Sequence, residues 1–275
     1  MKKYFVLFIL IFSLISVSCS NKEAVKKTDS KNIASVEINK QDNTSDIPYK
    51  LHGIPVLMYH SIGVEKNNPI KMPKEQFETE MKYLKDNGYT TLSLKELYDY
   101  FENKVPVPDK SVVITLDDGY EDNYTEAFPI LKRYGLKATI FVITSNVDKN
   151  SAFITSSQIK EMDSAGIEIE SHTVTHRDLD KLTYKEQYAE LKDSKSFLEG
   201  LLGKNIDYMA YPTGKYNDNT IKAVKAVGYK MALSTNGRWA DKTDGIFTLD
   251  RVYISTFHSM TIFKERLTNP NYKIN

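Results

Sequence analysis

Residues 135–143 read Gly-Leu-Lys-Ala-Thr-Ile-Phe-Val-Ile, a glycine followed by a short run rich in β-branched and aromatic side chains. A helical segment precedes this glycine, and a glycine just past a helix end can supply the left-handed residue that terminates it. The same order recurs at Gly88, Gly166 and Gly228. These junctions predict that helices and strands alternate along the chain, which is typical of a parallel sheet.

Helix starts and strand candidates agree with this alternation. Ser93 and Thr183 each stand three residues before a Glu, which matches a capping box, and Phe77, Met81 and Leu84 lie at helical spacing. Strands are predicted at residues 54–59, 112–116, 138–143, 167–169, 208–210, 230–233 and 247–252. About seven parallel strands favour an α/β fold with an irregular (β/α) barrel over a small open sheet.

Composition describes an ordinary globular chain. It has 275 residues, of which 41% are hydrophobic and 27% are charged, with 37 Lys and Arg against 36 Asp and Glu. A nucleic-acid partner would require a clustered basic excess, so we expect none. Residues 52–275 contain no second low-complexity break and are predicted to form one catalytic domain and a monomer.

The N-terminal region has the features of an export signal. Basic residues at positions 2 and 3 precede an apolar run over 4–17, which predicts a signal peptide at residues 1–18. Cys19, the only cysteine, then stands where bacterial lipoproteins carry their lipid. Residues 19–51 would form a flexible tether that begins at this cysteine. We expect a lipoprotein on the outer face of the cell membrane, with simple secretion as the alternative.

Polar residues collect directly after the predicted strands. His60 follows the first strand, Asp117 and Asp118 follow the second, and His172 begins a segment that ends at His176 after the fourth. Parallel α/β proteins build their sites at the carboxyl ends of strands, so we expect these residues to meet. Two histidines four residues apart on a helical turn would lie on one face and suit a shared metal ion.

The two adjacent acids can take different roles. Successive side chains of an extended segment point in opposite directions, so one carboxylate can bind metal while its neighbour faces the substrate. No Glu follows His172, which excludes the zincin arrangement. Taken singly, the Asp-Gly pair could be a turn and the histidines could be surface residues. Their conjunction at neighbouring strand ends favours a site.

Three of these segments resemble the motifs of the polysaccharide deacetylases, the family-four carbohydrate esterases. They are Thr115–Gly119 (TLDDG), His172–His176 (HTVTH) and Tyr211–Gly214 (YPTG). The opening Pro55–His60 (PVLMYH) is similar to the branch that acts on poly-β-1,6-N-acetylglucosamine. The resemblance spans about residues 54–267 and implies the irregular barrel of that family.

The resemblance implies a role for each site residue. Asp118, His172 and His176 would bind one divalent metal ion, expected to be Zn with Co, Ni or Mn as alternatives. Asp117 would be the general base. His60 would be the general acid.

Other assignments are less direct. His258 is the alternative general acid. Tyr211, Pro212 and Thr213 are expected on the substrate and oxyanion side. Trp239 is expected beside the acetyl pocket, or else is an ordinary half-buried tryptophan.

The third motif departs from the family pattern. Relatives usually carry Arg and an aromatic residue where this chain has Ala210 and Thr213. The Arg that steadies the base in relatives is therefore predicted to be missing here.

Together these features predict an exported, metal-dependent hydrolase that removes N-acetyl groups from N-acetylglucosamine residues of an extracellular or cell-wall polysaccharide. Two alternatives remain. Two His and one carboxylate also form the facial triad of non-haem iron enzymes. A surface lipoprotein that binds carbohydrate but has lost catalysis is the other.

Overall fold

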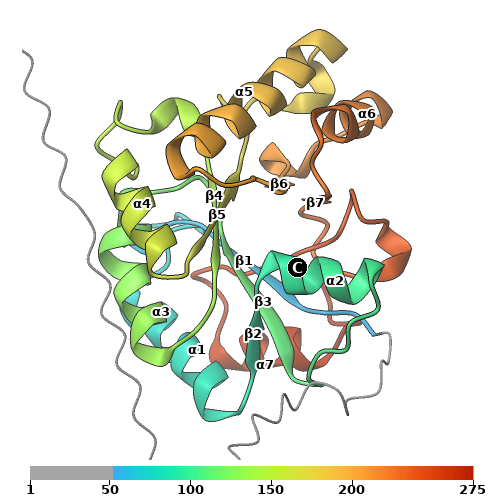
Figure 1. The fold of residues 1–275 in the computed structure, drawn as a ribbon. Coiled ribbons are helices and arrows are strands. Elements are labelled where there is room, and N and C mark those ends of the chain that lie inside the picture. The colour runs from blue at the N-terminus through green and yellow to red at the C-terminus, as the bar shows by residue number, and fades with distance from the viewer. Residues whose placement is uncertain (1–51, 275) are drawn as a thin grey trace, which may run out of the picture. The chain divides into compact units, whose positions relative to one another are not determined.

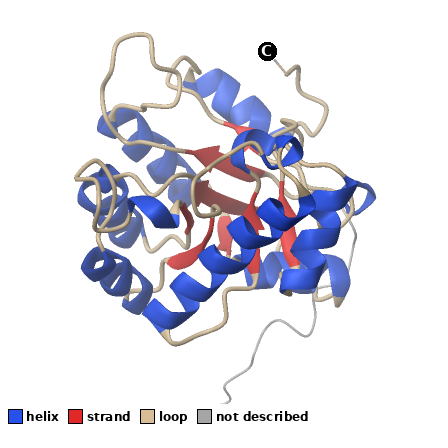
Figure 2. Cartoon of the chain, turned by 90° about the horizontal axis from the view of Figure 1, so that it is seen from above, coloured by secondary structure: helices blue, strands red, loops and turns tan. Residues whose placement is uncertain are grey.

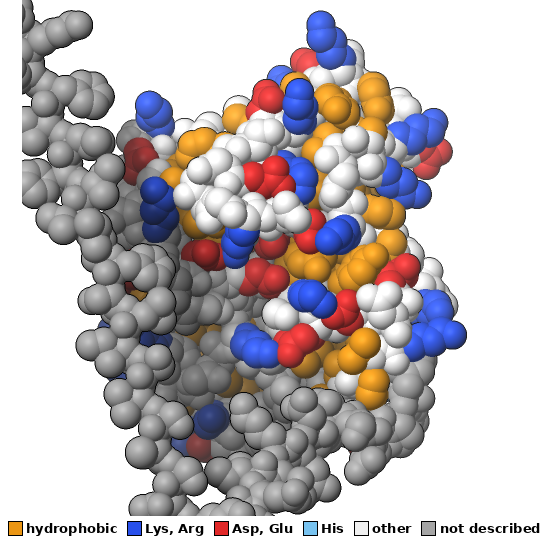
Figure 3. Space-filling view, in the orientation of Figure 1, with side chains coloured by type: hydrophobic (Ala, Val, Ile, Leu, Met, Phe, Trp, Pro, Cys, Tyr) orange, Lys and Arg blue, Asp and Glu red, His pale blue; other side chains and the backbone are white. Residues whose placement is uncertain are grey.

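The structure is a computed structural model that describes residues 52–274. The predicted signal peptide at 1–18, Cys19 and the predicted tether over 19–51 all lie outside these residues. Within the described range, no helix is long and apolar enough to cross a membrane. On the face shown in Figure 3, acidic and basic side chains are interspersed over the described surface.

A curved parallel sheet forms the centre of the domain (Figure 1). Its main order is β7-β6-β5-β4-β3-β1-β8, and β2 pairs with β3 beside this path. The strands are β1 (Val56–Tyr59), β2 (Thr90–Leu92), β3 (Ser111–Leu116), β4 (Thr139–Val142), β5 (Glu168–Ser171), β6 (Tyr208–Ala210), β7 (Met231–Leu233) and β8 (Val252–Tyr253).

Helices connect the strands and surround the sheet when the domain is seen from above (Figure 2). They are α1 (Lys74–Asp86), α2 (Leu94–Glu102), α3 (Phe128–Tyr134), α4 (Ser156–Ser164), α5 (Tyr184–Leu202), α6 (Asp218–Val227) and α7 (Met260–Thr268). The capping boxes predicted at Ser93 and Thr183 are confirmed at the starts of α2 and α5. Gly135 and Gly228 end α3 and α6 in the left-handed conformation.

The irregular barrel is confirmed, with two differences in its strands. The short strand β2 follows Gly88 and was not among the predicted strands. The candidate at 247–252 contributes only its last residue to β8. The chain before β8 instead contacts β7 through one isolated bridge, Leu233 with Leu249. The sheet is therefore a half-barrel whose two end strands are joined by a loop.

Alternation along the strands produces two apolar layers. Leu57 and Ile114 face outward into the cluster formed with the surrounding helices. Val56 and Val113, one residue away from them in sequence, face the inside of the curved sheet, where they join a cluster with Leu97 of α2. Successive strand residues point to opposite faces, and the residues on each face belong to an apolar cluster. Both surfaces of the sheet are therefore buried. This packing fixes the strand ends that carry the polar motifs.

Candidate functional site

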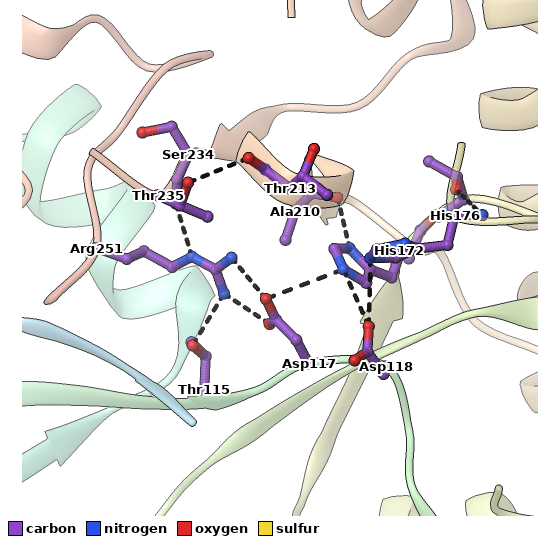
Figure 4. Close-up of polar contacts among 12 residues, drawn as sticks. Thr115, Asp117, Asp118, His172, His176, Ala210, Thr213, Ser234, Thr235 and Arg251 are labelled. Carbon is purple, nitrogen blue, oxygen red and sulfur yellow. Dashed lines mark hydrogen bonds and ion pairs between the residues drawn. The ribbon is translucent and has the colours of Figure 1, made fainter. Parts of the chain in front are cut away.

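The polar motifs meet at the carboxyl ends of the strands, as predicted. Tyr59 is in register with Leu116, so His60 and Asp117 follow adjacent strands. The Asp117 N–H also donates to the Tyr59 carbonyl at 2.9 Å. His172 directly follows β5, on the far side of β4 from β3. Asp117 lies between His172 and an arginine, Arg251 (Figure 4).

Asp118, His172 and His176 form a group that could hold a metal ion. Oδ1 of Asp118 lies 3.5 Å from Nε2 of His172 and 3.4 Å from Nε2 of His176. Among the described residues this buried oxygen has no hydrogen-bond partner. Buried polar atoms are rarely left unpaired. A carboxylate oxygen that faces two imidazole nitrogens is the donor set of a divalent metal with open positions for water or substrate.

His172 is held in the tautomer that a metal requires. Its Nδ1 lies 2.8 Å from the carbonyl oxygen of Ala210, so Nδ1–H donates and the Nε2 lone pair faces Asp118. Burial lowers the pKa of His172, although the charges of Asp117 and Asp118 oppose this shift. A neutral imidazole therefore faces the site. His176 is about a third exposed, at 31% of its side chain, which leaves this side open.

The two histidines are not on a helical turn, so that part of the prediction is wrong. Residues 172–176 form a loop, in which Thr173 and His176 have φ angles of 64° and 59°. The ring centroids still lie 4.8 Å apart. Asp118 also has a positive φ of 75°. The side chains of Asp117 and Asp118 are therefore separated by a backbone turn at Asp118, and not by the alternation of side chains along an extended strand.

Arg251 supplies the arginine that the third motif lacks, and the prediction of a missing partner for the base is wrong. Its Nη1 and Nη2 lie 2.6 and 2.7 Å from the two carboxylate oxygens of Asp117. Both side chains are buried, with Arg251 fully inaccessible. Burial would raise the pKa of Asp117, but the charge of Arg251 and its hydrogen bonds to the carboxylate hold this pKa well below its usual range. Asp117 is therefore an ionised, oriented carboxylate.

Arg251 is itself fixed on all sides. Its Nε donates to the carbonyl of Ser234 at 2.9 Å, and Nη1 also contacts the Thr115 hydroxyl at 3.2 Å. The guanidinium lies over the Phe141 ring, 5.5 Å from its centroid. Sequence reasoning missed this residue, although an arginine inside the predicted strand 247–252 was a visible signal.

The structure favours His60 over His258 as the acid. His60 lies close enough to Asp117 for a protonated imidazole to lower the pKa of that carboxyl. Its backbone carbonyl accepts a 2.7 Å hydrogen bond from the Asn123 amide. By contrast, Nδ1 of His258 accepts the Ser255 N–H at 3.1 Å. Burial, with a smaller contribution from a nearby arginine, lowers the pKa of His258 to about 4, so this ring is neutral at pH 7.

The third motif lies beside the same group. Tyr211 is buried, its N–H donates to the Leu233 carbonyl and its hydroxyl donates to the Phe247 carbonyl, so its role is structural. Pro212 has no N–H. Thr213 has a φ of 54°, and its N–H donates to no group among the hydrogen bonds of residues 52–274. This N–H is the candidate oxyanion donor.

Trp239 lies at the other end of the sheet, so its placement beside the acetyl pocket is not supported. The neighbouring Ala240 bridges to Ile54, which precedes β1, whereas the site follows β1. The indole N–H donates to the Arg266 carbonyl at 2.7 Å. Trp239 is therefore the ordinary half-buried tryptophan of the alternative interpretation.

The buried ion pair between Asp117 and Arg251 leads to a prediction about the stability of the fold when Arg251 is replaced. Replacement of the arginine in Arg251→Met leaves a buried, unpaired carboxylate and should lower the free energy of unfolding at pH 7 by about 3–5 kcal/mol. The double variant Arg251→Met/Asp117→Asn should recover much of this loss. Because folding lowers the pKa of Asp117, the stabilisation is present above its ordinary pKa of 3.8 and is lost as pH falls below it. Urea unfolding at pH 7 measures both variants, and equal stabilities of wild type and Arg251→Met would contradict the prediction.

Comparisons with known proteins agree with this geometry. Residues 104–232 match the polysaccharide deacetylase family. YxkH of Bacillus subtilis (strain 168), whose name assigns it to the polysaccharide deacetylases, is 38% identical over 278 residues, covering 96% of this chain and 97% of that protein. A poly-beta-1,6-N-acetyl-D-glucosamine N-deacetylase of Staphylococcus aureus (strain N315) is 29% identical, with coverages of 92% and 93%.

A solved structure agrees as well. The Streptococcus pyogenes deacetylase PplD, in complex with acetate, superposes with a TM-score of 0.76 at 35% identity, covering 79% of this chain and 99% of that one. These likenesses set aside the non-haem iron alternative. The likeness to YxkH over nearly the full length shows that the chain belongs to the polysaccharide deacetylase family, and it is a deacetylase enzyme.

Proposed function

We propose that this deacetylase depends on a divalent metal ion and removes acetyl groups from N-acetylglucosamine residues of an extracellular or cell-wall polysaccharide. The observation that carries the proposal is the group Asp118, His172 and His176 beside the ion-paired carboxylate of Asp117. The sugar is inferred from the relative that is named a poly-beta-1,6-N-acetyl-D-glucosamine N-deacetylase. Zn suits this donor set, and Co, Ni or Mn are alternatives.

The site must improve both reactants, because an amide is a poor electrophile and water a poor nucleophile. A divalent ion held by Asp118, His172 and His176 would polarise the acetyl carbonyl and acidify a water molecule. Asp117 accepts the proton of the attacking water at a carboxylate oxygen, since each oxygen keeps a lone pair beside its bond to Arg251. Arg251 prevents the carboxylate from rotating and keeps it ionised.

The remaining residues handle the charges that develop on the substrate. The free N–H of Thr213 can donate to the carbonyl oxygen as negative charge builds on it. His60 donates a proton to the sugar nitrogen as the carbon–nitrogen bond breaks, which yields acetate and a free amine. The low pKa of Asp117 keeps the base ionised, as acceptance of a proton from water requires.

Metal dependence is tested directly at the three ligands. Acetate release from poly-β-1,6-N-acetylglucosamine should disappear after chelation and return on addition of Zn²⁺. Asp118→Asn and His176→Ala should each lose at least about 100-fold in kcat/KM, because the site loses a ligand. Asp193→Asn, which changes an exposed acid on α5, is the control. Normal turnover by the chelated enzyme or by His176→Ala would rule out the proposed metal.

The roles of base and acid are separated by the choice of leaving group. Asp117→Asn should retain the metal but lose nearly all turnover, on amides and activated esters alike. His60→Ala should retain the metal and lose amidase activity by about 100-fold or more, but far less activity on an activated ester, whose leaving group needs little protonation. Equal losses of His60→Ala on both substrates, or loss of its metal, would remove His60 as the acid.

We also propose that the protein is exported and carries lipid on Cys19, on the basis of the apolar N-terminal segment and the position of this cysteine. The enzyme would then act at the outer face of the membrane. Wild type should fractionate with membranes, whereas Cys19→Ser should not be processed to the same form. Unlipidated wild-type protein found only in the medium would establish simple secretion instead.

A further inference from the structure

The loop between the two candidate metal-binding histidines has a backbone that needs external support. Residues 173–175 belong to no helix or strand. Thr173 and His176, at the two sides of the loop, both have positive φ angles. Residues with a Cβ atom adopt this conformation only when surrounding contacts impose it. Those contacts therefore decide where the His176 imidazole points.

Glu190 of α5 provides the principal contacts. Its Oε2 accepts the backbone N–H of Val174 at 3.0 Å and that of Thr175 at 2.8 Å. Its Oε1 accepts the Thr175 hydroxyl. Glu190 is 8% exposed, so these three bonds are largely shielded from water. Bonds to an ionised acceptor are among the strongest that a loop can form.

The opposite side of the loop is held by backbone groups. The carbonyl of Thr173 accepts the Thr144 N–H at 3.1 Å, and the carbonyl of Val174 accepts the Ser145 N–H at 2.9 Å. The N–H groups of residues 173 and 176 donate to side-chain oxygens of Ser171 and Thr173. Each N–H from 173 to 176 thus has an acceptor. Glu190 is the charged member of this set and comes from a helix that carries no proposed ligand.

We propose that Glu190 is a positioning residue that holds the loop, and with it His176, in the metal-binding geometry before an ion arrives. The inference rests on the proposed metal site and deepens it. Without the carboxylate, the N–H groups of Val174 and Thr175 lose their acceptor. The loop can then relax to negative φ angles and carry Nε2 of His176 away from Asp118. Glu190 acts through the backbone and contacts none of the three ligand atoms.

The test measures binding of Zn²⁺ to the metal-free protein, in the absence of substrate, by titration calorimetry. Glu190→Ala should raise the Zn²⁺ dissociation constant by about 10–100-fold. This is the usual effect of removing a group that orients a metal ligand. Glu190→Gln should stay close to wild type. Its amide oxygen can accept both N–H bonds, and the Thr175 hydroxyl can accept from the amide nitrogen.

Glu186→Gln is the matched control. Glu186 lies one turn earlier on α5, and its Oε1 is 3.5 Å from Arg177, whose Nε is 3.6 Å from Oε1 of Glu190. Within the described residues, Glu186 accepts no hydrogen bond from residues 173–175, and Gln preserves its capping box. This variant should bind Zn²⁺ as wild type does. It shows that a change of charge beside Arg177 is not sufficient to weaken binding.

A purely structural role of Glu190 would lower the unfolding temperature of the metal-free protein without changing its Zn²⁺ affinity. That result for Glu190→Ala would overturn the proposal. If this variant does not fold, Glu190→Asp replaces it, because the shorter side chain cannot reach all three donors. Wild-type Zn²⁺ affinity in Glu190→Asp would equally overturn it. Wild type that fails to bind Zn²⁺ would contradict the proposed metal site itself, whereas binding by wild type isolates the effect of Glu190.

Discussion

The buried ion pair between Asp117 and Arg251 is the contact on which the arrangement of the site depends. An isolated carboxylate is costly to bury, so Asp117 can remain charged beside the barrel core only with this partner. The bidentate geometry fixes both oxygens and leaves a lone pair on each for proton transfer. The bond from Nε of Arg251 to the Ser234 carbonyl also ties this pair to the chain just beyond β7.

Unfavourable backbone conformations cluster around this pair. Asp118, Thr173, His176 and Thr213 all have positive φ angles, and all lie in the connections that follow strand ends, with Thr213 inside a short 3-10 turn. Strain of this kind persists only where the surrounding structure imposes it, and it is common at functional sites. Rigid strands place the loops, and buried groups such as Glu190 fix their turns. The proposed metal ligands therefore lie on irregular segments, and the strands and buried hydrogen-bonding groups hold those segments in fixed positions.

The sequence was sufficient for the barrel and for the residues that meet at its rim, because strand ends and helix caps are local features. It was not sufficient for contacts between distant segments. Arg251 is separated from Asp117 by more than half of the domain, and the family match ends at residue 232, before it. Trp239 could not be placed, because the bridge between its neighbour Ala240 and Ile54, before β1, is long-range. The loop at 172–176 was read as helical, since spacing alone does not reveal positive φ angles.

The position of Arg251 in the chain has a consequence for the order of folding. Asp117 and all three proposed ligands come well before Arg251 in the sequence, and Arg251 directly precedes β8. Until β8 docks beside β1, a folding domain has a carboxylate without its counter-charge at the rim of an incomplete sheet. We therefore expect formation of the ion pair to couple the docking of β8 to completion of the site.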